Sequence, residues 1–287
     1  MTHDAPIASI AIPAYNESAV ISRCLSSLLE SALPGELEVV VACNGCTDDT
    51  ARIAASYDGV TVVEVDRASK IAALNAADDA LTAFPRFYLD ADVEVTTESV
   101  RTLIGEMSTL GALCGAPRPD FETVGRSWLI RSFYAVWARQ PYLRQQPVGN
   151  GVYVLTAEGR KRFGRFPQVV SDDLFVRNSF HITERYCSPD VSFTIHTPRT
   201  LRGLMKMRVR VHRGNAELTA ADPRTDAQHG RRIKSLLDQA DNLGAVAQVG
   251  VFVGVNVVAR ALARLKRYAG RHTWERDESA RELEAGS

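Results

Sequence analysis

The chain has 287 residues, and its 34 basic and 34 acidic side chains give a formal net charge of zero. This length is enough to bury a large core, while the balanced charge provides no general attraction to nucleic acid. We therefore expect a globular protein, one large α/β domain with an appendage, and exclude the class of nucleic-acid-binding proteins.

Three apolar runs near the N-terminus are predicted to be buried strands, each followed by the start of a helix. They cover residues 7–12, 37–43 and 60–65, and the candidate N-caps behind them are Ser18, Thr47 and Ser69. Strands that alternate with helices predict a parallel sheet whose loops gather at one edge.

A fourth apolar run, residues 86–89, ends in two carboxylates one residue apart, Asp90-Ala91-Asp92. Open α/β folds bind ligands at this edge of the sheet. Two carboxylates suit Mg²⁺ or Mn²⁺, which takes further ligands from the phosphates of a substrate. The pair therefore predicts a metal site for a nucleotide diphosphate.

The order of four segments resembles the family 2 glycosyltransferases, whose nucleotide-sugar-binding fold is called GT-A. Residues 10–17 are similar to the opening strand and loop of the family, 44–50 to its D-x-S-T-D-x-T segment, 69–75 to its G-K-x-x-A-L-N segment, and 90–92 to its metal motif. Further on, 149–151 are similar to its acceptor-side G-G-N, 171–174 to its E-D-x-x-L, and 208–214 to a degraded Q-R-x-R-W of processive members.

This resemblance implies a metal-dependent, inverting transferase. Such an enzyme moves a sugar from a nucleotide-diphosphate sugar to an acceptor hydroxyl, here in the synthesis of a cell-envelope glycan or glycolipid. The expected GT-A domain covers residues 1–215, with a nucleotide-binding half over about 1–116 and an acceptor half over about 117–215, and a helical extension follows over 216–287. Because Met207 and Val211 replace the Gln and Trp of the processive motif, we expect transfer of a single sugar.

The resemblance also implies the residues of the site. Those expected to bind the nucleotide-sugar are Pro13, Ala14, Tyr15, Glu17, Asn44, Asp48, Lys70, Asp90, Ala91, Asp92, Arg210 and Arg213. Those expected to bind the acceptor are Gly149, Asn150 and Gly151.

Asn44 departs from the pattern, because most members have an Asp here that contacts the uracil ring, and Ser69 replaces a Gly before Lys70. An amide can both donate and accept a hydrogen bond, so Asn44 can still pair with the edge of a base. We expect a UDP-sugar first and leave the identity of the base open.

Asp172 and Asp173 are the candidates for the catalytic base. Inverting transfer needs a base within hydrogen-bond reach of the acceptor hydroxyl. By resemblance Asp173 takes the catalytic position, and Asp172 takes that of a Glu that orients the acceptor or the base. The register is open by one residue, so Asp172 is the alternative base. Acidic residues in a first helical turn are also ordinary complements of the helix dipole.

The run of cations over residues 199–213 has two interpretations. It can be a solvated basic helix, or it can close over the diphosphate and stabilise the leaving group, with Arg210 and Arg213 as the chosen residues. His196, just before the run, is expected to be a packed histidine, with a third metal ligand as the alternative.

The five cysteines include the pair Cys43 and Cys46 in a C-x-x-C arrangement. This spacing is typical of a thioredoxin-like redox site, but we prefer two small residues in a nucleotide-binding loop. The odd number of cysteines, with no secretory signal before the first strand, predicts reduced thiols and a cytoplasmic protein.

The C-terminal extension contains a predicted polar helix over 227–242 and an uncharged apolar stretch over 243–259, followed by Arg260, Arg264, Lys266 and Arg267. The stretch falls short of the roughly 20 apolar residues that span a bilayer. We expect a helix docked on protein or, as the alternative, an interfacial helix on an anionic leaflet, which would make the protein peripheral at the inner face of the plasma membrane. The tail after residue 270 is predicted to be disordered.

A second class of function stays open, namely a non-catalytic nucleotide-sugar-binding or assembly subunit with the same fold. A nucleotidyltransferase is a weaker alternative, because no Gly-rich phosphate loop follows the first strand. The enzyme is favoured because the acidic residues of both the metal and the base motif are present.

Overall fold

The computed structural model describes residues 5–140, 143, 151–169, 171–221 and 242–268. The chain divides into two compact units, one of residues 1–120 and 141–195 and the other of residues 121–140 and 196–287. The domain boundaries expected from the sequence, with a glycosyltransferase domain over residues 1–215 and a helical extension over 216–287, stay a proposal.

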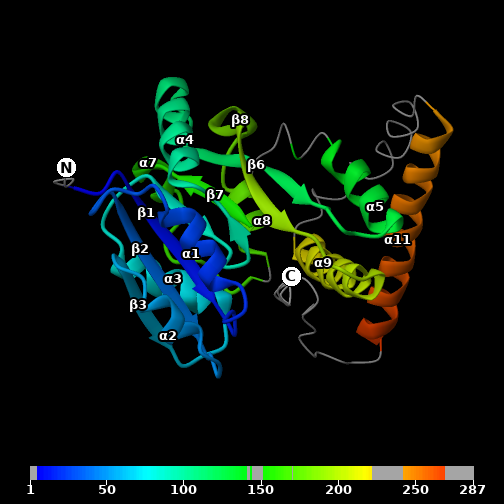
Figure 1. Ribbon diagram of the computed structural model, residues 1–287, viewed down its shortest axis with the longest axis horizontal. Coiled ribbons are helices and arrows are strands. Elements are labelled where there is room, and N and C mark those ends of the chain that lie inside the picture. The colour runs from blue at the N-terminus through cyan, green and yellow to red at the C-terminus, as the bar shows by residue number, and fades with distance from the viewer. Residues whose placement is uncertain (1–4, 141–142, 144–150, 170, 222–241, 269–287) are drawn as a thin grey trace. The chain divides into compact units, whose positions relative to one another are not determined.

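The first unit is built on a mixed sheet. Its parallel part contains β3 (Val60–Val65), β2 (Leu37–Asn44), β1 (Ala8–Ala14) and β4 (Arg86–Leu89) (Figure 1). The sheet continues with β7 (Val152–Leu155), β6 (Cys114–Glu122), β8 (Arg185–His196) and β5 (Val93–Glu94), in the order β3-β2-β1-β4-β7-β6-β8-β5. Strand β7 is antiparallel to both β4 and β6. The predicted α/β fold with a mainly parallel sheet is confirmed.

Helices cover both faces of this sheet, because successive side chains of a strand point to opposite faces. Ile10 and Ile12 of β1 share one core with α1 (Ile21–Leu29), α2 (Thr50–Ala54) and α4 (Thr97–Leu110). Ala11 of β1 and Tyr88 of β4 share the other core with α3 (Lys70–Ala80) and α8 (Asp172–Asn178). The short helices α7 (Ala157–Arg160) and η1 (Ile182–Glu184) complete the unit.

One of the three predicted N-caps is confirmed. The Ser69 hydroxyl accepts a hydrogen bond from the Ala72 amide at 3.3 Å at the start of α3. Ser18 and Thr47 are not caps, because α1 and α2 begin later, with Val20 and Asp49 at the N-cap positions. The Asp48 carboxylate accepts from the amides of Ser18 and Thr50 instead, which holds the two loops together ahead of the helices.

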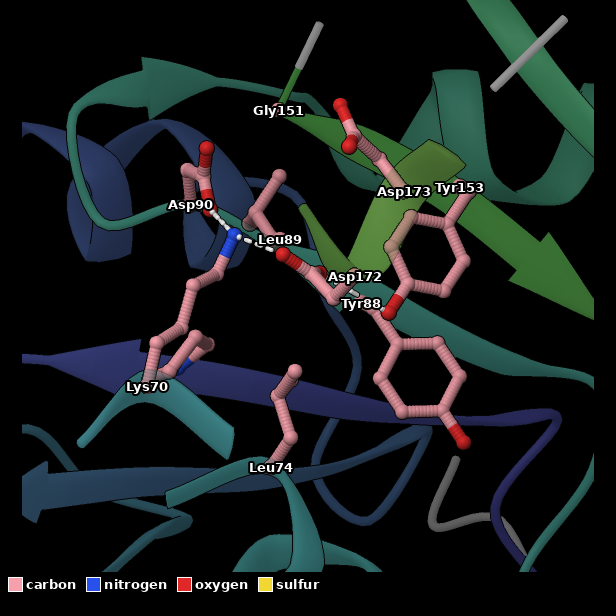
Figure 2. A pocket seen from close by; sticks show the side chains of 10 residues that line it. Lys70, Leu74, Tyr88, Leu89, Asp90, Gly151, Tyr153, Asp172 and Asp173 are labelled. Atoms are coloured by element: carbon pink, nitrogen blue, oxygen red, sulfur yellow. Dashed lines mark hydrogen bonds and ion pairs between the residues drawn. The ribbon is translucent and has the colours of Figure 1, made fainter. Parts of the chain in front are cut away.

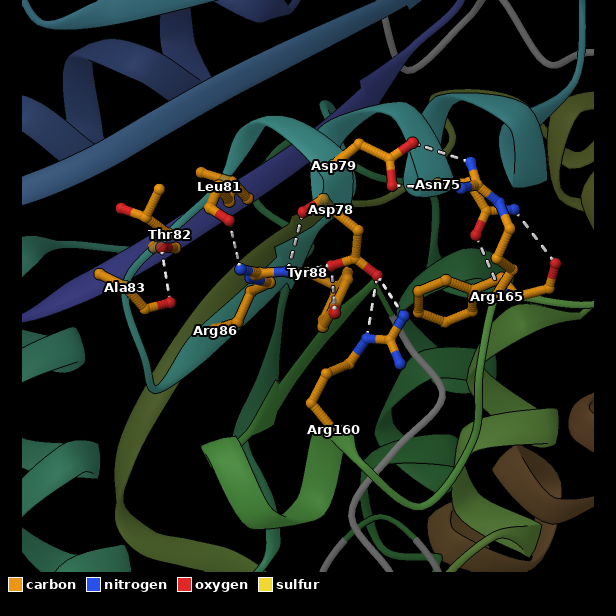
Figure 3. A network of polar contacts seen from close by, with 12 residues as sticks. Asn75, Asp78, Asp79, Leu81, Thr82, Ala83, Arg86, Tyr88, Arg160 and Arg165 are labelled. Atoms are coloured by element: carbon orange, nitrogen blue, oxygen red, sulfur yellow. Dashed lines mark hydrogen bonds and ion pairs between the residues drawn. The ribbon is translucent and has the colours of Figure 1, made fainter.

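A buried ionic network holds α3, β4 and α7 together on the side of the second core (Figure 3). Asp78 is the centre of this network. Its carboxylate lies 2.6 Å from Arg86 and 2.6 Å from Arg160, and it accepts a 2.7 Å hydrogen bond from the Tyr88 hydroxyl. Since breaking a buried ion pair leaves an uncompensated charge, this network fixes the backbone behind Tyr88.

The second unit contains α5 (Trp128–Ala138), α9 (Leu201–Ala221) and α11 (Leu243–Tyr268). Phe133 of α5, Leu204 of α9 and Phe252 of α11 meet in its core. The aromatic residues of α5 therefore mostly pack in this core, although Trp128 is 51% exposed.

Helix α11 is longer than the predicted apolar stretch over 243–259. Within it, the segment Leu243–Lys266 contains an 18-residue window with a mean hydropathy of 1.7, and by length and composition alone the segment is long and apolar enough to cross a membrane. Residues 227–241 of the other predicted helix, and the tail after residue 270, lie outside the described residues.

Candidate active site

A small pocket opens at the carboxyl ends of β1 and β4, where α3 and α8 begin (Figure 2). The residues that line it come from five elements or their adjoining loops, and they are Pro13, Lys70, Leu74, Tyr88, Leu89, Asp90, Gly151, Tyr153, Asp172 and Asp173. Six of them are residues that the sequence assigned to the site. The fold therefore brings the predicted donor motif, the acceptor motif and the base motif together.

Lys70, the first residue of α3, bridges two of these motifs. Its ammonium lies 2.7 Å from the Asp90 carboxylate and 2.9 Å from the Asp172 carboxylate. Its side chain is 36% exposed, whereas that of Asp172 is only 5% exposed. The pair with Asp172 is therefore the more deeply buried of the two contacts.

The pKa values of Asp90 and Lys70 are both shifted by their surroundings. Burial is the largest influence on Asp90 and raises its pKa to about 6, although Lys70 opposes this shift. Burial alone would lower the pKa of Lys70, but the nearby carboxylates, Asp172 first, raise it overall. Lys70 is therefore a permanent cation of the site.

Asp172 and Asp173 differ in their surroundings. Both oxygens of Asp172 are engaged, one by Lys70 and the other by the Tyr153 hydroxyl at 3.2 Å. Asp173 accepts from the Ser171 hydroxyl at 2.5 Å and the Leu174 amide at 2.7 Å, both through the same oxygen. Among the described residues no cation is paired with Asp173, and Figure 2 shows its carboxylate apart from the Lys70–Asp172 pair.

Burial, followed by the charge of Asp172, raises the pKa of Asp173. A carboxylate with a raised pKa and an oxygen left for a substrate is the better proton acceptor. These surroundings support Asp173 over Asp172 as the base, an assignment that stays a proposal.

Gly151 comes close to the carboxylate of Asp90. Its φ is +106°, and a Cβ atom there would lie 3.0 Å from Val93 Cγ1 and 3.4 Å from Asp90 Oδ2. Its carbonyl also accepts a 2.8 Å hydrogen bond from the Asp90 amide. Glycine is therefore needed at this position, because a larger residue would push against the metal motif. The other two residues of the predicted acceptor motif, Gly149 and Asn150, lie outside the described residues.

The predicted nucleotide loop, residues 13–17, is tied to the segment that follows β2. Asn44 is buried, and its amide nitrogen donates to the Ala14 carbonyl at 2.8 Å. This bond fixes the orientation of the amide, because only its nitrogen can donate. The amide oxygen and the second N–H of Asn44 are not used by this bond.

Asp48 connects the loop after β1 to the segment after β2 through hydrogen bonds to the amides of Ser18 and Thr50. Burial alone would raise its pKa, but hydrogen bonds from Thr50 and Ser18 lower it overall. The Glu17 amide donates to the Thr50 hydroxyl at 2.7 Å, so Thr50 joins the two segments as well. Tyr15 belongs to the loop of residues 13–17 and is partly exposed.

The predicted donor atoms for a divalent cation are the carboxylates of Asp90 and Asp92, in the segment that follows β4. No cluster of three or more His, Cys, Asp or Glu side chains suited to a metal occurs in the described part of the chain. Two hard oxygen donors beside Ala91 still suit Mg²⁺ or Mn²⁺, if phosphate and water supply the other ligands. His196 directly follows Ile195, which pairs with Val93 of β5. The alternative role of His196 as a third metal ligand stays a prediction.

The predicted basic run is helical, since it lies mostly in α9. Arg210 is exposed, and the side chain of Arg213 lies outside the described residues. Arg208 instead faces the core of the second unit, over the Trp137 ring at 5.0 Å and bonded to Asn256 at 2.7 Å. The closure of Arg210 and Arg213 over a diphosphate stays a prediction.

All five cysteines are free thiols. Burial, followed by the neighbouring Cys46, raises the pKa of Cys43 to about 12, which makes it a poor nucleophile at neutral pH. The Cys46 thiol lies 3.4 Å from the Ala14 carbonyl. Both residues therefore act as packing groups of the nucleotide loop.

Two tyrosines of the site were not singled out from the sequence. Tyr88 and Tyr153 occupy paired positions on β4 and β7, and their rings stack with centroids 4.7 Å apart. The signal that would have indicated them is strand alternation, which points both residues to the face that carries α3 and α8. Their pairing depends on the register of two strands far apart in the sequence.

Comparison with known proteins gives a family match over more than half of the chain. The model of the family named Glycosyl transferase family 2 matches residues 9–161. Glycosyltransferase AglE of Haloferax volcanii is 32% identical over 98 residues, a segment that covers 32% of this chain and 32% of that relative. The match therefore spans about a third of the length of this curated relative.

Two solved structures show the same fold. The mannosyltransferase PcManGT from Pyrobaculum calidifontis, in complex with GDP-Man and Mn²⁺, has a TM-score of 0.60 and 22% identity, covering 93% of this chain and 79% of that one. Glucosyl-3-phosphoglycerate synthase from Mycobacterium tuberculosis, with Mn²⁺, UDP and glucosyl-3-phosphoglycerate, has a TM-score of 0.53 and 18% identity, covering 75% and 79%. The predicted GT-A fold is confirmed.

Proposed function

This chain belongs to glycosyl transferase family 2, and on that basis we propose that it transfers one sugar, with inversion, from a nucleotide-diphosphate sugar to an acceptor hydroxyl. The observation that carries the proposal is the meeting of Asp90, Lys70 and Asp173 in one pocket. These residues belong to three motifs far apart in the sequence. Together they provide a metal ligand, a permanent cation and a proton acceptor.

Asp173 acts as the base in this proposal. Its second oxygen takes the proton of the acceptor hydroxyl, and that hydroxyl attacks the anomeric carbon on the face opposite the departing diphosphate. The raised pKa of Asp173 improves its affinity for the proton. Asp172 is held by Lys70 and Tyr153, so it orients the site rather than accepting the proton.

Asp90 and Asp92 would hold Mg²⁺ or Mn²⁺, which supplies positive charge to the diphosphate as it leaves. Lys70 adds a second cation at the same place, because its ammonium already lies beside Asp90. Asn44 offers its amide oxygen to an N–H group of the base, and both uracil and guanine carry such a group. Either a UDP-sugar or a GDP-sugar therefore fits, with the UDP-sugar first.

We propose a cell-envelope glycan or glycolipid as the product, formed by a cytoplasmic protein that is peripheral at the inner face of the plasma membrane. The support comes from the outward face of α11. The apolar residues exposed there recur at helical spacing, and they are Leu243, Val246, Ala247, Gly250, Gly254, Val257, Val258, Ala261, Leu262 and Leu265. Only 11% of the apolar window is buried, so α11 is unlike the core helix of a soluble protein.

The polar contacts on the opposite face of α11 favour a helix that lies on the membrane over one that spans it. Asn256 on that face bonds to Arg208 at 2.7 Å and lies 3.2 Å from the His212 ring nitrogen. Crossing the bilayer would carry these polar partners into hydrocarbon or break their bonds. An interfacial helix keeps them and buries only the apolar face.

The charges of α11 favour anionic lipid over a second copy of the chain as the occupant of this face. Arg260 and Arg264 are exposed beside it, and the sequence of α11 contains no acidic residue. A second α11 would offer these cations no partner, whereas anionic headgroups would.

Flotation with vesicles of phosphatidylcholine and phosphatidylglycerol tests this location. We expect the double variant Arg260→Glu and Arg264→Glu to bind about 30-fold more weakly or worse, since each cation near such a surface contributes about 1 kcal/mol. The control is Arg52→Glu with Lys161→Glu, two exposed cations of the first unit, which changes the net charge equally. Equal binding of both double variants would refute docking through α11.

A panel of nucleotide-sugars tests the transferase itself. We expect one donor to be hydrolysed slowly without an acceptor in the presence of Mn²⁺ and not in EDTA, and Asp92→Ala to lose this activity. The alternative function is a non-catalytic nucleotide-sugar-binding subunit. Tight donor binding without turnover under any condition would favour that alternative.

A further inference from the structure

Tyr88 and Tyr153 form a stacked pair whose hydroxyl groups reach different neighbours. The two rings are nearly parallel, at 17°. The Tyr88 hydroxyl donates to Asp78 at 2.7 Å, in the ionic network behind the pocket, whereas the Tyr153 hydroxyl donates to Asp172 at 3.2 Å, inside the pocket. Figure 2 shows the Tyr88 hydroxyl pointing away from Lys70 and the Tyr153 hydroxyl meeting Asp172.

The bond from Tyr153 decides how Asp172 faces Lys70. Asp172 belongs to the first turn of α8, and its side chain has two oxygens that point in different directions. Tyr153 occupies Oδ2, so Oδ1 is the oxygen that contacts the ammonium. Without the tyrosine hydroxyl, Oδ2 would lose its partner, and the plane of the carboxylate would no longer be held at a fixed angle to the Lys70 ammonium.

The ammonium of Lys70 has three N–H donors. Asp90 and Asp172 take two of them, and the contacts of the described residues show no further partner for the nitrogen. One donor is left for a ligand in the pocket. Its direction follows from the positions of the two carboxylates, because the three N–H bonds have a fixed tetrahedral geometry.

We propose that Tyr153 is a positioning residue for the donor substrate. It holds Asp172, Asp172 and Asp90 together orient the Lys70 ammonium, and the remaining N–H of Lys70 binds an oxygen of the nucleotide-sugar. This inference rests on the proposed function and adds to it a residue that touches neither the donor nor the acceptor hydroxyl.

Tyr153→Phe tests the proposal, with Tyr88→Phe as its matched control. Each substitution removes one hydroxyl and keeps the stacked ring. Calorimetric titration with the donor and Mn²⁺ is expected to show about 3- to 10-fold weaker binding for Tyr153→Phe, in the range of one lost hydrogen bond, and a smaller loss of donor binding for Tyr88→Phe, whose hydroxyl bonds to Asp78 behind the pocket. Thermal unfolding of both variants should show that Tyr88→Phe loses at least as much stability, because its hydroxyl bonds to the buried Asp78–Arg86 ion pair.

A double-mutant cycle with Lys70→Ala separates positioning from a general effect on folding. If Tyr153 acts through Lys70, then Tyr153→Phe should not weaken donor binding any further in the Lys70→Ala background. The KM for the acceptor should stay constant in Tyr153→Phe. The loss of affinity in Tyr153→Phe is then measured for the nucleoside diphosphate and for the nucleotide-sugar. An equal loss for both ligands indicates that Lys70 binds a phosphate oxygen, and a loss for the nucleotide-sugar alone indicates an oxygen of the sugar.

Three results would overturn the proposal. They are equal donor affinities of Tyr153→Phe and Tyr88→Phe, an effect of Tyr153→Phe that persists unchanged in the Lys70→Ala background, and a rise in the acceptor KM alone. Failure of the proposed function looks different. If the wild-type chain binds the donor but transfers no sugar, the proposed transferase function is refuted, and the role of Tyr153 can still be tested by the double-mutant cycle in donor binding. If the wild-type chain binds no donor, both proposals are refuted.

Discussion

Replacement of Asp173 by Asn tests the chemistry most directly, because the change keeps the shape of the side chain and removes only its ability to take a proton. The amide oxygen can still accept the bonds now donated by the Ser171 hydroxyl and the Leu174 amide. We therefore expect an intact fold and a transfer rate lower by about 10²- to 10⁴-fold, the usual contribution of a general base. Donor affinity should change little, because Asp173 has no ion pair with Lys70.

The same substitution should not lower stability at neutral pH. The pKa of Asp173 is raised in the folded chain, first by burial and then by Asp172. A raised carboxyl pKa means that the folded state prefers the protonated form, so this contribution to stability is present at low pH and lost as the pH rises through the folded pKa. At pH 7 the charged Asp173 therefore costs stability. We expect Asp173→Asn to melt at the same temperature as the wild type or higher.

The transfer rate should depend on pH in the opposite direction to this stability contribution. Only the ionised carboxylate can accept the proton, so the rate should fall as the pH drops through the pKa of Asp173. Because that pKa is raised, the fall should begin above the ordinary value of about 3.9 for an aspartate. The measurement is kcat against pH with saturating donor and acceptor.

Asp172→Asn is the control for this prediction. It leaves Lys70 with a single carboxylate, so donor affinity should fall by about 10-fold, the cost of one hydrogen bond to a charged group, with a smaller loss in kcat than Asp173→Asn. The reverse order of the two kcat values would make Asp172 the base. Unchanged transfer in both variants would refute the assignment of a base to this pair.

Two further predictions concern the donor side of the pocket. Asn44→Asp would place a carboxylate against the Ala14 carbonyl, so we expect a loss of about 1–3 kcal/mol in urea unfolding; equal stability together with tighter UDP binding would contradict the reasoning. Gly151→Ala should cost about 1–3 kcal/mol and weaken binding of the nucleotide with Mn²⁺, because its backbone is left-handed and its Cβ would approach Asp90. Gly105→Ala, at a helical position with open space around it, is the control and should cause neither change.

The sequence alone determined the local features of this protein. Apolar runs bounded by helix-start residues predicted β1 to β4 and the helices between them, because burial and helix capping act over a few residues. The same logic placed Asp90 and Asp92 at the ligand edge of the sheet. It failed at Ser18 and Thr47, since the Asp48 carboxylate binds backbone amides of both loops and the helices begin after those bonds.

The different roles of the pocket residues depend on contacts between segments that are far apart in the sequence. Nothing in the local pattern distinguishes Asp172 from Asp173, because both stand in the first turn of one helix. Their difference arises from Lys70 on α3 and Tyr153 on β7, which approach one carboxylate and not the other. The pairing of Tyr88 with Tyr153 depends on strand register, and the exposure of one face of α11 depends on which helices cover the other. Contacts of this kind are set by packing between segments far apart in the chain, and no short-range signal in the sequence encodes them.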